Sequence, residues 1–204
     1  MSHISQLKSH MNICFATNNK KKLEEVRSAL KGRDIQLQSL EEIGCTEELP
    51  ETGETLEANA LQKAQYVSKN YNISCFADDT GLEVEALNGA PGVYSGRFSG
   101  EPRSDTRNVD LLLEKLQGTI NRKARFRTVF ALLLNGEQHL FEGIAEGAIT
   151  EGRSGEGGFG YDPVFVPKGF QQTFAELSMD EKNEISHRGK AVRKLILFLD
   201  SETF

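Results

Sequence analysis

The sequence predicts an α/β protein, because strand-like apolar runs alternate along the chain with helical patterns. An apolar run at residues 12–16 leads through a polar segment into a helical pattern that ends near Gly32. Two further helical patterns follow at about residues 55–70 and 105–117. The opening order of strand, polar loop and helix places that loop at the carboxyl end of a strand and at a helix N-terminus.

The remaining strands are expected at residues 35–40, 73–77, 124–134 and 138–149. The last two form a hairpin, because Asn135-Gly136 between them is the strongest short turn signal in the sequence. They are long enough to extend the sheet into a second lobe. Ser178 and Glu181 have the spacing of a capping box that opens a helical stretch, and a last helix follows Ser186.

The composition is that of a soluble globular protein. The 204 residues suffice for one domain or for two lobes, and hydrophobic residues make up 38% of the chain against 26% charged residues. The net charge of −6 argues against nucleic acid as a partner, since nucleic-acid-binding proteins usually carry a basic surface. A local basic cluster for a single anionic ligand is compatible with this charge.

The cysteines and the N-terminal end of the chain indicate a cytoplasmic protein. Cys14, Cys45 and Cys75 lack the spacing of a zinc site and are odd in number, which indicates free buried thiols in a reducing compartment. No apolar run is long enough to span a membrane, and the N-terminus lacks a signal-peptide core. Residues 1–10 are polar and are expected to be an extension without a structural role.

Two adjacent carboxylates, Asp78 and Asp79, follow the apolar run at residues 73–77 and precede Gly81. Period-two alternation resumes after them, so they are expected at a strand end or at a sharp bend. Successive extended residues point to opposite faces, so one carboxylate is expected to bind metal or water while its neighbour orients it. An aspartate-rich turn capped by Gly81 is the alternative interpretation.

The polar segment after the first strand is a candidate phosphate site. It consists of Thr17, Asn18, Asn19, Lys20, Lys21 and Lys22. Free backbone amides and the helix dipole favour phosphate at a helix N-terminus, lysine adds positive charge, and Thr and Asn add small donors. An ordinary N-cap followed by a solvated run of lysines explains the same residues equally well.

Other polar residues occur where a ligand site would need them. Glu51, in a loop before a helix, is able to join an aspartate around a hard cation, although most loop glutamates bind none. Asn59 and Lys63 share one face of that helix, where a lysine usually snorkels at the rim. Glycines interleave with aromatic residues around Phe159, which suits base stacking and equally a structural loop.

In their order and spacing, these segments resemble the inosine triphosphate pyrophosphatase family. The resemblance rests on residues 17–22, 76–82, 89–95, 158–163 and 186–188, with Glu181-Lys182-Asn183 before the last, and covers nearly all of residues 11–200. It implies a single two-lobed α/β domain over residues 11–204, with a long central mixed β-sheet flanked by helices and an active-site cleft between the lobes. A homodimer is also implied.

The resemblance further implies hydrolysis of ITP, dITP and XTP to the nucleoside monophosphate and pyrophosphate, by Mg²⁺-assisted attack of water at the α phosphorus. Asp79 would be the general base and a metal ligand, with Asp78 beside it and Glu51 as a further metal ligand. The loop at residues 17–22 would hold the triphosphate, and Thr80 would touch the substrate. The residues expected around the base are Phe159, Gly160, Tyr161, Asp162, Lys182, His187 and Arg188.

Two positions depart from the family pattern. Asn18 stands where the family commonly has Gly, a change that a left-handed backbone tolerates. Ala58 stands where the family commonly has Glu. The neighbouring Glu57 is turned by roughly 100° on a helix, so it is not expected to substitute.

Two other functions fit parts of the same pattern. A related pyrophosphatase for modified pyrimidine or methylated guanosine triphosphates would use a similar cleft, although Phe159 and the edge at residues 186–188 argue against it. A non-catalytic nucleotide-binding module would not need Asp78, Asp79 and Glu51 intact.

Overall fold

A seven-stranded mixed sheet forms the centre of the computed structural model, which describes residues 11–201. The strand order is β2-β1-β3-β5-β6-β7, with β4 paired to β3. The strands are β1 (Met11–Phe15), β2 (Ile35–Gln38), β3 (Cys75–Val84), β4 (Pro91–Gly92), β5 (Lys123–Leu134), β6 (Glu137–Ile149) and β7 (Phe165–Pro167). β1 is parallel to β2 and β3, whereas the other pairings are antiparallel. The extension expected at residues 1–10 lies outside the described residues.

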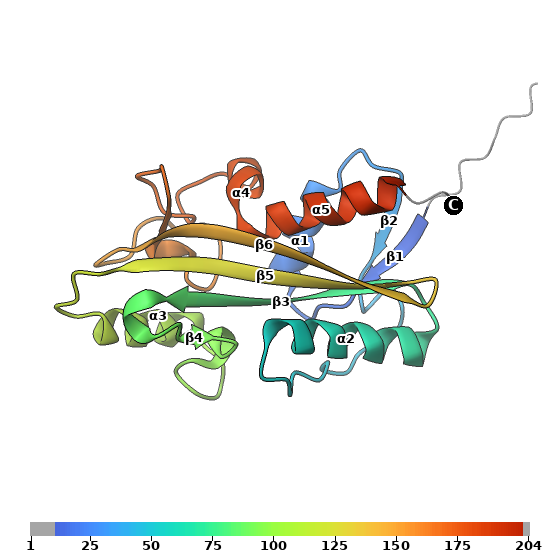
Figure 1. Ribbon diagram of the computed structural model, residues 1–204, viewed down its shortest axis with the longest axis horizontal. Helices are drawn as coiled ribbons and strands as arrows, with labels where there is room; N and C mark the ends of the chain where they lie inside the picture. Colours follow the sequence, from blue (N-terminus) through green and yellow to red (C-terminus); the bar gives the residue numbers. More distant parts are fainter. Residues whose placement is uncertain (1–10, 202–204) are drawn as a thin grey trace, which may run out of the picture.

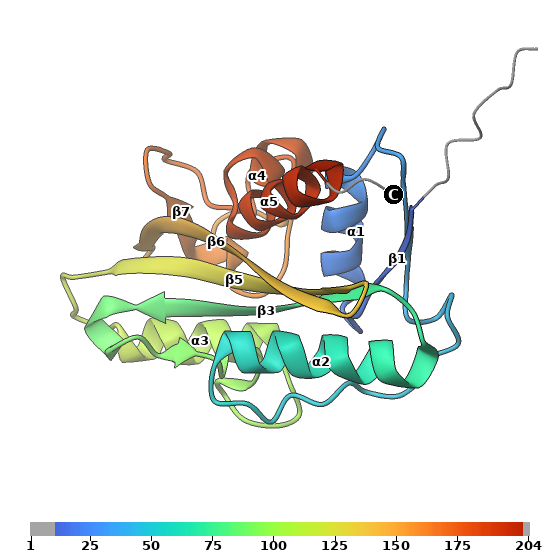
Figure 2. The same cartoon turned by 45° about the vertical axis from the view of Figure 1, so that its right-hand side comes forward.

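Helices cover both sides of this sheet, as Figures 1 and 2 show. They are α1 (Lys20–Ala29), α2 (Leu56–Tyr71), α3 (Asp105–Lys115), α4 (Met179–Ile185) and α5 (His187–Ser201). Helices α1 and α5 pack on one face, and α2 packs on the opposite face. Short 3-10 helices are η1 (Glu85–Leu87), η2 (Ser95–Arg97) and η3 (Asp162–Val164). The α/β class with a mixed sheet flanked by helices is thus confirmed.

The predicted hairpin is the longest paired segment of the sheet. β5 and β6 pair in register from Lys123↔Ala148 to Leu134↔Glu137 and run along the length of the molecule. Between them, Asn135 and Gly136 have φ angles of 51° and 83°, the left-handed values that a tight hairpin turn requires. The capping box at Ser178 and Glu181 is also confirmed at the start of α4.

Three phenylalanines pack β1, which precedes residues 17–22, against β3, which carries Asp78 and Asp79. Phe15 on β1 stacks on Phe76 of β3 with ring centroids 4.7 Å apart, and Phe130 of β5 contacts both rings. All three are fully buried. Because aromatic side chains contribute large apolar areas to a core, this cluster holds the carboxyl end of β1 beside the start of β3.

The prediction that Asp78 and Asp79 lie at a strand end or bend is wrong. β3 continues through both residues and pairs with β5 without interruption from Cys75↔Leu133 to Val84↔Ala124. The ladder to β5 satisfies the backbone here, so the polar side chains do not end the strand. Gly81 does not form a turn either. A Cβ at this position would lie 2.6 Å from the carbonyl oxygen of Gly92, so close backbone approach explains the glycine.

A second close approach brings the start of α5 against the sheet. A Cβ on Gly143 of β6 would lie 1.9 Å from the carbonyl oxygen of His187. Within α5, a Cβ on Gly189 would lie 1.7 Å from the carbonyl oxygen of Asn183. Gly143 therefore lets the start of α5 lie directly over the sheet, and Gly189 lets α5 pack closely against α4.

The three cysteines are buried and unpaired, as expected, and all lie within the described range. They pack in one apolar cluster with residues of α2, and burial raises the pKa of the Cys75 thiol to about 12. Over residues 11–201, no helix is both long and apolar enough to cross a bilayer.

Candidate active site

A cavity of about 230 Å³ opens where the end of β1, the middle of β3, α2 and the starts of α4 and α5 converge. Fourteen of the predicted site residues line it. They are Thr17, Asn18, Asn19, Lys22, Glu51, Asp79, Thr80, Phe159, Gly160, Tyr161, Asp162, Lys182, His187 and Arg188. Asp78 lies directly behind this lining, whereas Lys20 is exposed and does not contribute to it.

Asp78 connects β3 to the segment at residues 17–22 through an ion pair with Lys22. Its carboxylate is fully buried and lies 2.9 Å from Lys22 Nζ on α1 and 3.6 Å from Arg188 on α5. It also accepts a hydrogen bond of 3.0 Å from Thr80 Oγ1. Burial alone would raise the pKa of Asp78, but the neighbouring Lys22, Arg188 and Lys63 hold it well below its usual range. Asp78 therefore stays ionised and serves as the anion that orders the surrounding cations.

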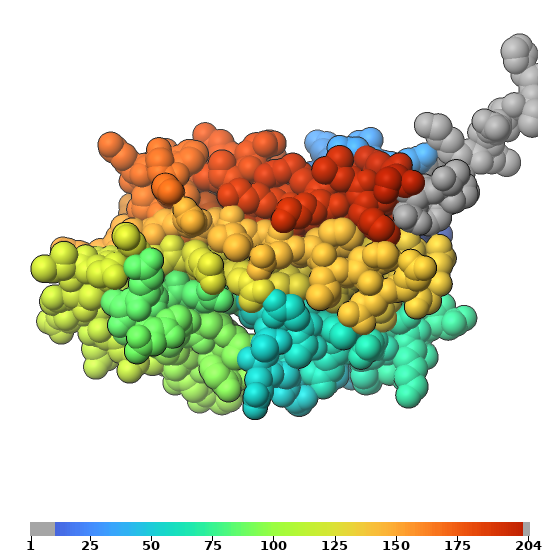
Figure 3. Space-filling model, in the orientation of Figure 1, coloured from blue at the N-terminus to red at the C-terminus, as the bar shows by residue number. Residues whose placement is uncertain are grey.

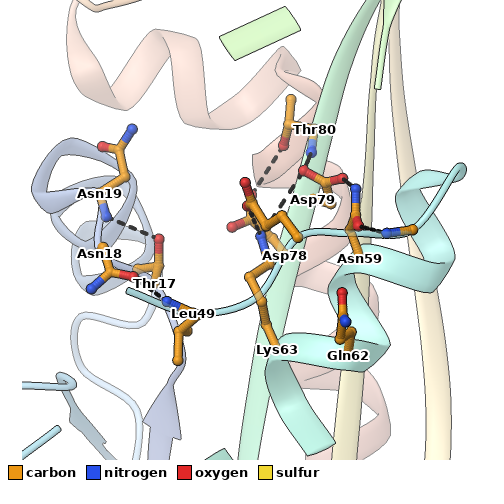
Figure 4. Close-up of polar contacts among 12 residues, drawn as sticks. Thr17, Asn18, Asn19, Leu49, Asn59, Gln62, Lys63, Asp78, Asp79 and Thr80 are labelled. Carbon is orange, nitrogen blue, oxygen red and sulfur yellow. Dashed lines mark hydrogen bonds and ion pairs between the residues drawn. The ribbon is translucent and has the colours of Figure 1, made fainter. Parts of the chain in front are cut away.

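Asp79 points to the opposite face of β3, as strand alternation requires. Asn59 on α2 donates a 2.9 Å hydrogen bond to Asp79 Oδ2, and the Thr80 backbone N–H donates to Oδ1. Figure 4 shows Asn59 and Lys63 reaching from α2 toward Asp79. Burial raises the pKa of Asp79, although Lys63 and Lys22 oppose the shift. A carboxylate with a raised pKa is a better proton acceptor than an exposed one.

Glu51 and Asp79 share Lys63 as a neighbouring cation. Glu51 Oε1 is 2.6 Å from Lys63 Nζ, which is itself 4.0 Å from Asp79 Oδ1. Arg103 approaches the other Glu51 oxygen at 3.3 Å. Asn59, besides holding Asp79, accepts a 2.7 Å hydrogen bond from the Gly53 backbone N–H, which ties the Glu51 loop to α2.

The chemistry of these two carboxylates fits a hard divalent cation. Mg²⁺ takes oxygen ligands and is usually held by one or two carboxylates together with substrate phosphates and water. Lys63 already places a positive charge between Glu51 and Asp79, so the position accommodates a cation. Across residues 11–201, no group of three or more His, Cys, Asp and Glu side chains is placed to hold a metal ion. An ion here would therefore need nucleotide oxygens as further ligands.

The second half of the predicted phosphate segment, residues 17–22, is helical. Lys20, Lys21 and Lys22 form the first turn of α1, and Asn19 caps it by accepting a 3.1 Å hydrogen bond from the Lys22 N–H. Thr17 Oγ1 accepts from the Asn19 N–H at 3.2 Å. Lys21 reaches across the cavity mouth and donates to the Gly158 carbonyl at 2.9 Å. Lys22 is therefore the lysine of the three that faces the cavity.

The cavity wall opposite α2 contains a buried ion-pair chain. Lys182 Nζ lies 2.6 Å from both Glu25 and Asp162, and Arg188 pairs with the second Glu25 oxygen. Asp162 also accepts a 2.8 Å hydrogen bond from the Phe159 N–H. The Phe159 ring lies over Lys182, with 5.0 Å between the ammonium and the ring centroid. This chain holds the aromatic residue and the two cations in one fixed arrangement.

Sequence reasoning missed Glu25, Arg103 and the role of Asn59. Glu25 follows Lys22 by three residues and so shares its face of α1, which is a usable signal. Arg103 and the partners of Asn59 depend on loop positions that no local pattern reveals. Tyr161, predicted to shape the pocket, donates a 2.9 Å hydrogen bond to the Ser95 carbonyl and so links two loops at the cavity.

Two buried nitrogens at the cavity have no hydrogen-bond partner among the described residues: His187 Nδ1 and Arg188 Nε. Burial, with Arg188 and Lys182 close by, lowers the pKa of His187 well below its ordinary value, so its imidazole is neutral at pH 7. His187 also stacks on Phe126 with centroids 4.6 Å apart. Buried polar atoms are usually satisfied, so these two nitrogens are exceptions in the wall of the cavity.

Residues 13–198 match the Ham1 family model. The chain belongs to the Ham1 family. A dITP/XTP pyrophosphatase of Flavobacterium psychrophilum is 54% identical over 188 residues, which cover 92% of this chain and 98% of that protein. The Staphylococcus aureus Ham1 protein structure is 39% identical with a TM-score of 0.84, covering 94% of this chain and 100% of that one. A Coxiella burnetii HAM1 protein structure is 36% identical, with a TM-score of 0.85 and the same coverage. The resemblance predicted from the motifs is thereby confirmed.

The two departures from the family pattern have structural explanations in this Ham1-family chain. Asn18 does not have a positive φ, so the left-handed backbone suggested for it is wrong. Its side chain instead spans to the loop after β2, donating to the Glu47 carbonyl at 3.3 Å and accepting from the Leu49 N–H at 3.4 Å. Glu57 pairs with Arg127 and does not line the cavity, so it does not replace the carboxylate absent at Ala58.

Replacing Asp78 with Asn is expected to destabilise the protein by about 3–5 kcal/mol, because Lys22 and Arg188 would lose a buried counter-charge. Asp110→Asn is the matched control, since that carboxylate is exposed and pairs with Arg153 on the surface. The control is expected to change stability by less than about 1 kcal/mol. Urea unfolding of both variants measures the difference, and equal stabilities would contradict this role for Asp78.

Proposed function

We propose that this protein hydrolyses ITP, dITP and XTP to the nucleoside monophosphate and pyrophosphate. The observation that carries the proposal is that the neighbouring carboxylates of β3, Asp78 and Asp79, point to opposite faces and have different partners. Asp78 is bonded to Lys22 on one face, while Asp79 points to the other face and has a raised pKa. The cavity thus combines a proton acceptor with a cation for phosphate. The high identity to relatives named dITP/XTP pyrophosphatases supports the choice of reaction and substrate.

In this mechanism Asp79 accepts a proton from the water that attacks the α phosphorus. Asn59 and the Thr80 N–H hold the carboxylate in place. The leaving pyrophosphate lies toward the start of α1, where Lys22 and the positive end of the helix dipole offset its charge. Fixed donors aimed at developing charge supply most of the stabilisation in reactions of this kind.

Glu51 and Asp79 would hold Mg²⁺ in this proposal. When bound, the ion would supply charge neutralisation at the phosphates and would polarise the bond that breaks. The carboxylate pair and the cation-accommodating position between them support this assignment.

The base is proposed to stack on Phe159, with its edge toward Lys182, His187 and Arg188. A 6-keto group accepts hydrogen bonds, whereas the 6-amino group of adenine donates them. Arg188 lines the cavity and carries donors but no acceptor, so it favours the keto purines, because an amino group would leave these donors without a partner. Thr80 and the residues Gly160, Tyr161 and Asp162 complete the walls around the nucleotide.

A homodimer is proposed through the outer surface of the hairpin. Figure 3 shows β5 and β6 as an uncovered band across one face of the molecule. β6 carries the exposed Leu140, and acidic and basic side chains such as Arg125 and Glu146 lie on the same two strands. Mixed charge of this kind allows a surface to be complementary to its own copy. Sedimentation velocity is expected to find a dimer that Leu140→Glu dissociates, and an unchanged dimer would exclude this surface.

The cytoplasm is the proposed location, with free nucleotides as the partner class. Three unpaired cysteines support a reducing compartment.

A hydrolysis panel tests the proposed function. Pyrophosphate release is measured from ITP, XTP, dITP, GTP and ATP, each with and without Mg²⁺. Fast release from the first three, only with Mg²⁺, is expected. No release from any nucleotide would indicate a non-catalytic binding module, and a preference for modified pyrimidine or methylated guanosine triphosphates, added as further substrates, would indicate the related pyrophosphatase.

Asp79→Asn is expected to lower kcat for ITP by at least about 10²-fold, because it removes the general base. Nucleotide binding, measured by equilibrium dialysis, should persist since Lys22 and Phe159 are intact. Asp110→Asn serves as the exposed control and is expected to retain full activity. Near-normal turnover of Asp79→Asn would remove Asp79 from the mechanism.

Arg188→Lys keeps the positive charge beside Glu25 and Asp78 but replaces the planar guanidinium with a single ammonium. The ratio of kcat/KM for ITP over ATP is expected to fall at least about tenfold. This ratio does not depend on the fraction of folded enzyme. The control is Arg193→Lys, an exposed position on the same helix. An unchanged ratio in Arg188→Lys would place base recognition elsewhere.

A further inference from the structure

The sequence suggested that Lys63 snorkels at the rim of the fold. Instead, its side chain ends between the carboxylates of Glu51 and Asp79. The residue is 5% exposed. Its Nζ lies 2.6 Å from Glu51 Oε1 and 4.0 Å from Asp79 Oδ1. Asn59, one turn earlier on α2, holds Asp79 on its other oxygen. The ammonium therefore sits where a cation bridging Glu51 and Asp79 would sit.

The local charges are already balanced without a metal ion. Glu51 and Asp79 contribute two negative charges, and Lys63 with Arg103 contributes two positive charges within ion-pair distance of them. A free divalent cation entering this group would meet no net negative charge. It would also be repelled by the nearby ammonium, and such repulsion is strong where water is excluded.

We propose that Lys63 is a built-in counter-cation that occupies the metal position until a divalent ion arrives together with the nucleotide. This inference rests on the proposed function, because it assumes that Glu51 and Asp79 are the metal ligands. The triphosphate brings the negative charge that the site lacks. It also gives the Lys63 ammonium phosphate oxygens to bond when the ammonium leaves Glu51. The site thus rejects free metal and accepts the metal–nucleotide complex.

An ordinary buried salt bridge makes a different prediction. If Lys63 only stabilised the fold, its removal would lower stability without raising the affinity for metal. If it occupies the metal position, its removal should expose an acidic pair that binds a free ion more tightly. Metal affinity in the absence of nucleotide therefore separates the two roles.

Mn²⁺ binding to the nucleotide-free full chain is the test, followed by electron paramagnetic resonance of the free ion. Mn²⁺ is the probe because it prefers the same oxygen ligands as Mg²⁺. Lys63→Met is expected to bind Mn²⁺ at least about tenfold more tightly than the wild type. Lys63→Gln, a polar replacement of similar length, serves as a second variant if the first fails to fold, with the same expectation.

Controls tie the gain to this position. Lys69→Met removes the same charge from an exposed site near the other end of α2 and is expected to bind Mn²⁺ as the wild type does. Adding Glu51→Gln to Lys63→Met is expected to abolish the gain. Equal affinities in wild type and Lys63 variants, or a gain that survives Glu51→Gln, would overturn the proposal.

A final arm separates this proposal from the proposed function. After subtraction of the Mn²⁺ that the analogue binds by itself, wild-type protein with a non-hydrolysable α,β-methylene analogue of ITP is expected to bind Mn²⁺ at least about tenfold more tightly than nucleotide-free protein. Mn²⁺ bound with the analogue, but no gain in the Lys63 variants, would overturn the counter-cation role alone. No Mn²⁺ binding in any sample would overturn both the role and the metal site.

Discussion

The buried carboxylate of Asp78 is the constraint on which the architecture of the cavity depends. An isolated charge in the core would cost several kcal/mol, so cations must be brought to it from neighbouring elements. Lys22 comes from α1 and Arg188 comes from α5, although they are far apart in the sequence. Satisfying this one anion therefore docks both helices on the same side of β3. It also leaves their polar starts facing a shared cavity.

Strand geometry then produces the second half of the site. Because Asp79 follows Asp78 directly, its side chain leaves the opposite face of β3 and meets α2. The pKa values of the two neighbouring carboxyl groups are shifted in opposite directions. Cations hold the pKa of Asp78 down, whereas burial raises the pKa of Asp79. One residue is thereby suited to ordering cations and the other to accepting a proton.

Much of the fold was predictable because the signals are local. The turn at Asn135-Gly136, the capping box at Ser178 and the helix after β1 are each set by a few neighbouring residues. The position of the acidic pair was not predictable in the same way. Two aspartates before a glycine favour a turn locally, but pairing with β5 along the whole of β3 overrides that preference. Tertiary context decided that element.

The candidate site shows the same division between local and long-range information. The sequence could indicate the residue types at Thr17, Lys22, Asp79 and Phe159 because each lies in a short motif. It could not indicate that Asn18 spans to the loop after β2, or that Glu25 joins Lys182 to Arg188. Nor could it reveal that Gly143 is required by the approach of α5. These contacts join segments far apart in the chain and exist only once the sheet has formed.

The most direct measurement is a crystal structure of the protein with Mg²⁺ and the α,β-methylene analogue of ITP. The triphosphate is expected to span the cavity, with its terminal phosphates at Lys22 and its α phosphorus near Asp79. The base should lie against Phe159. A nucleotide bound outside this cavity, or one whose α phosphorus lies far from Asp79, would contradict the account.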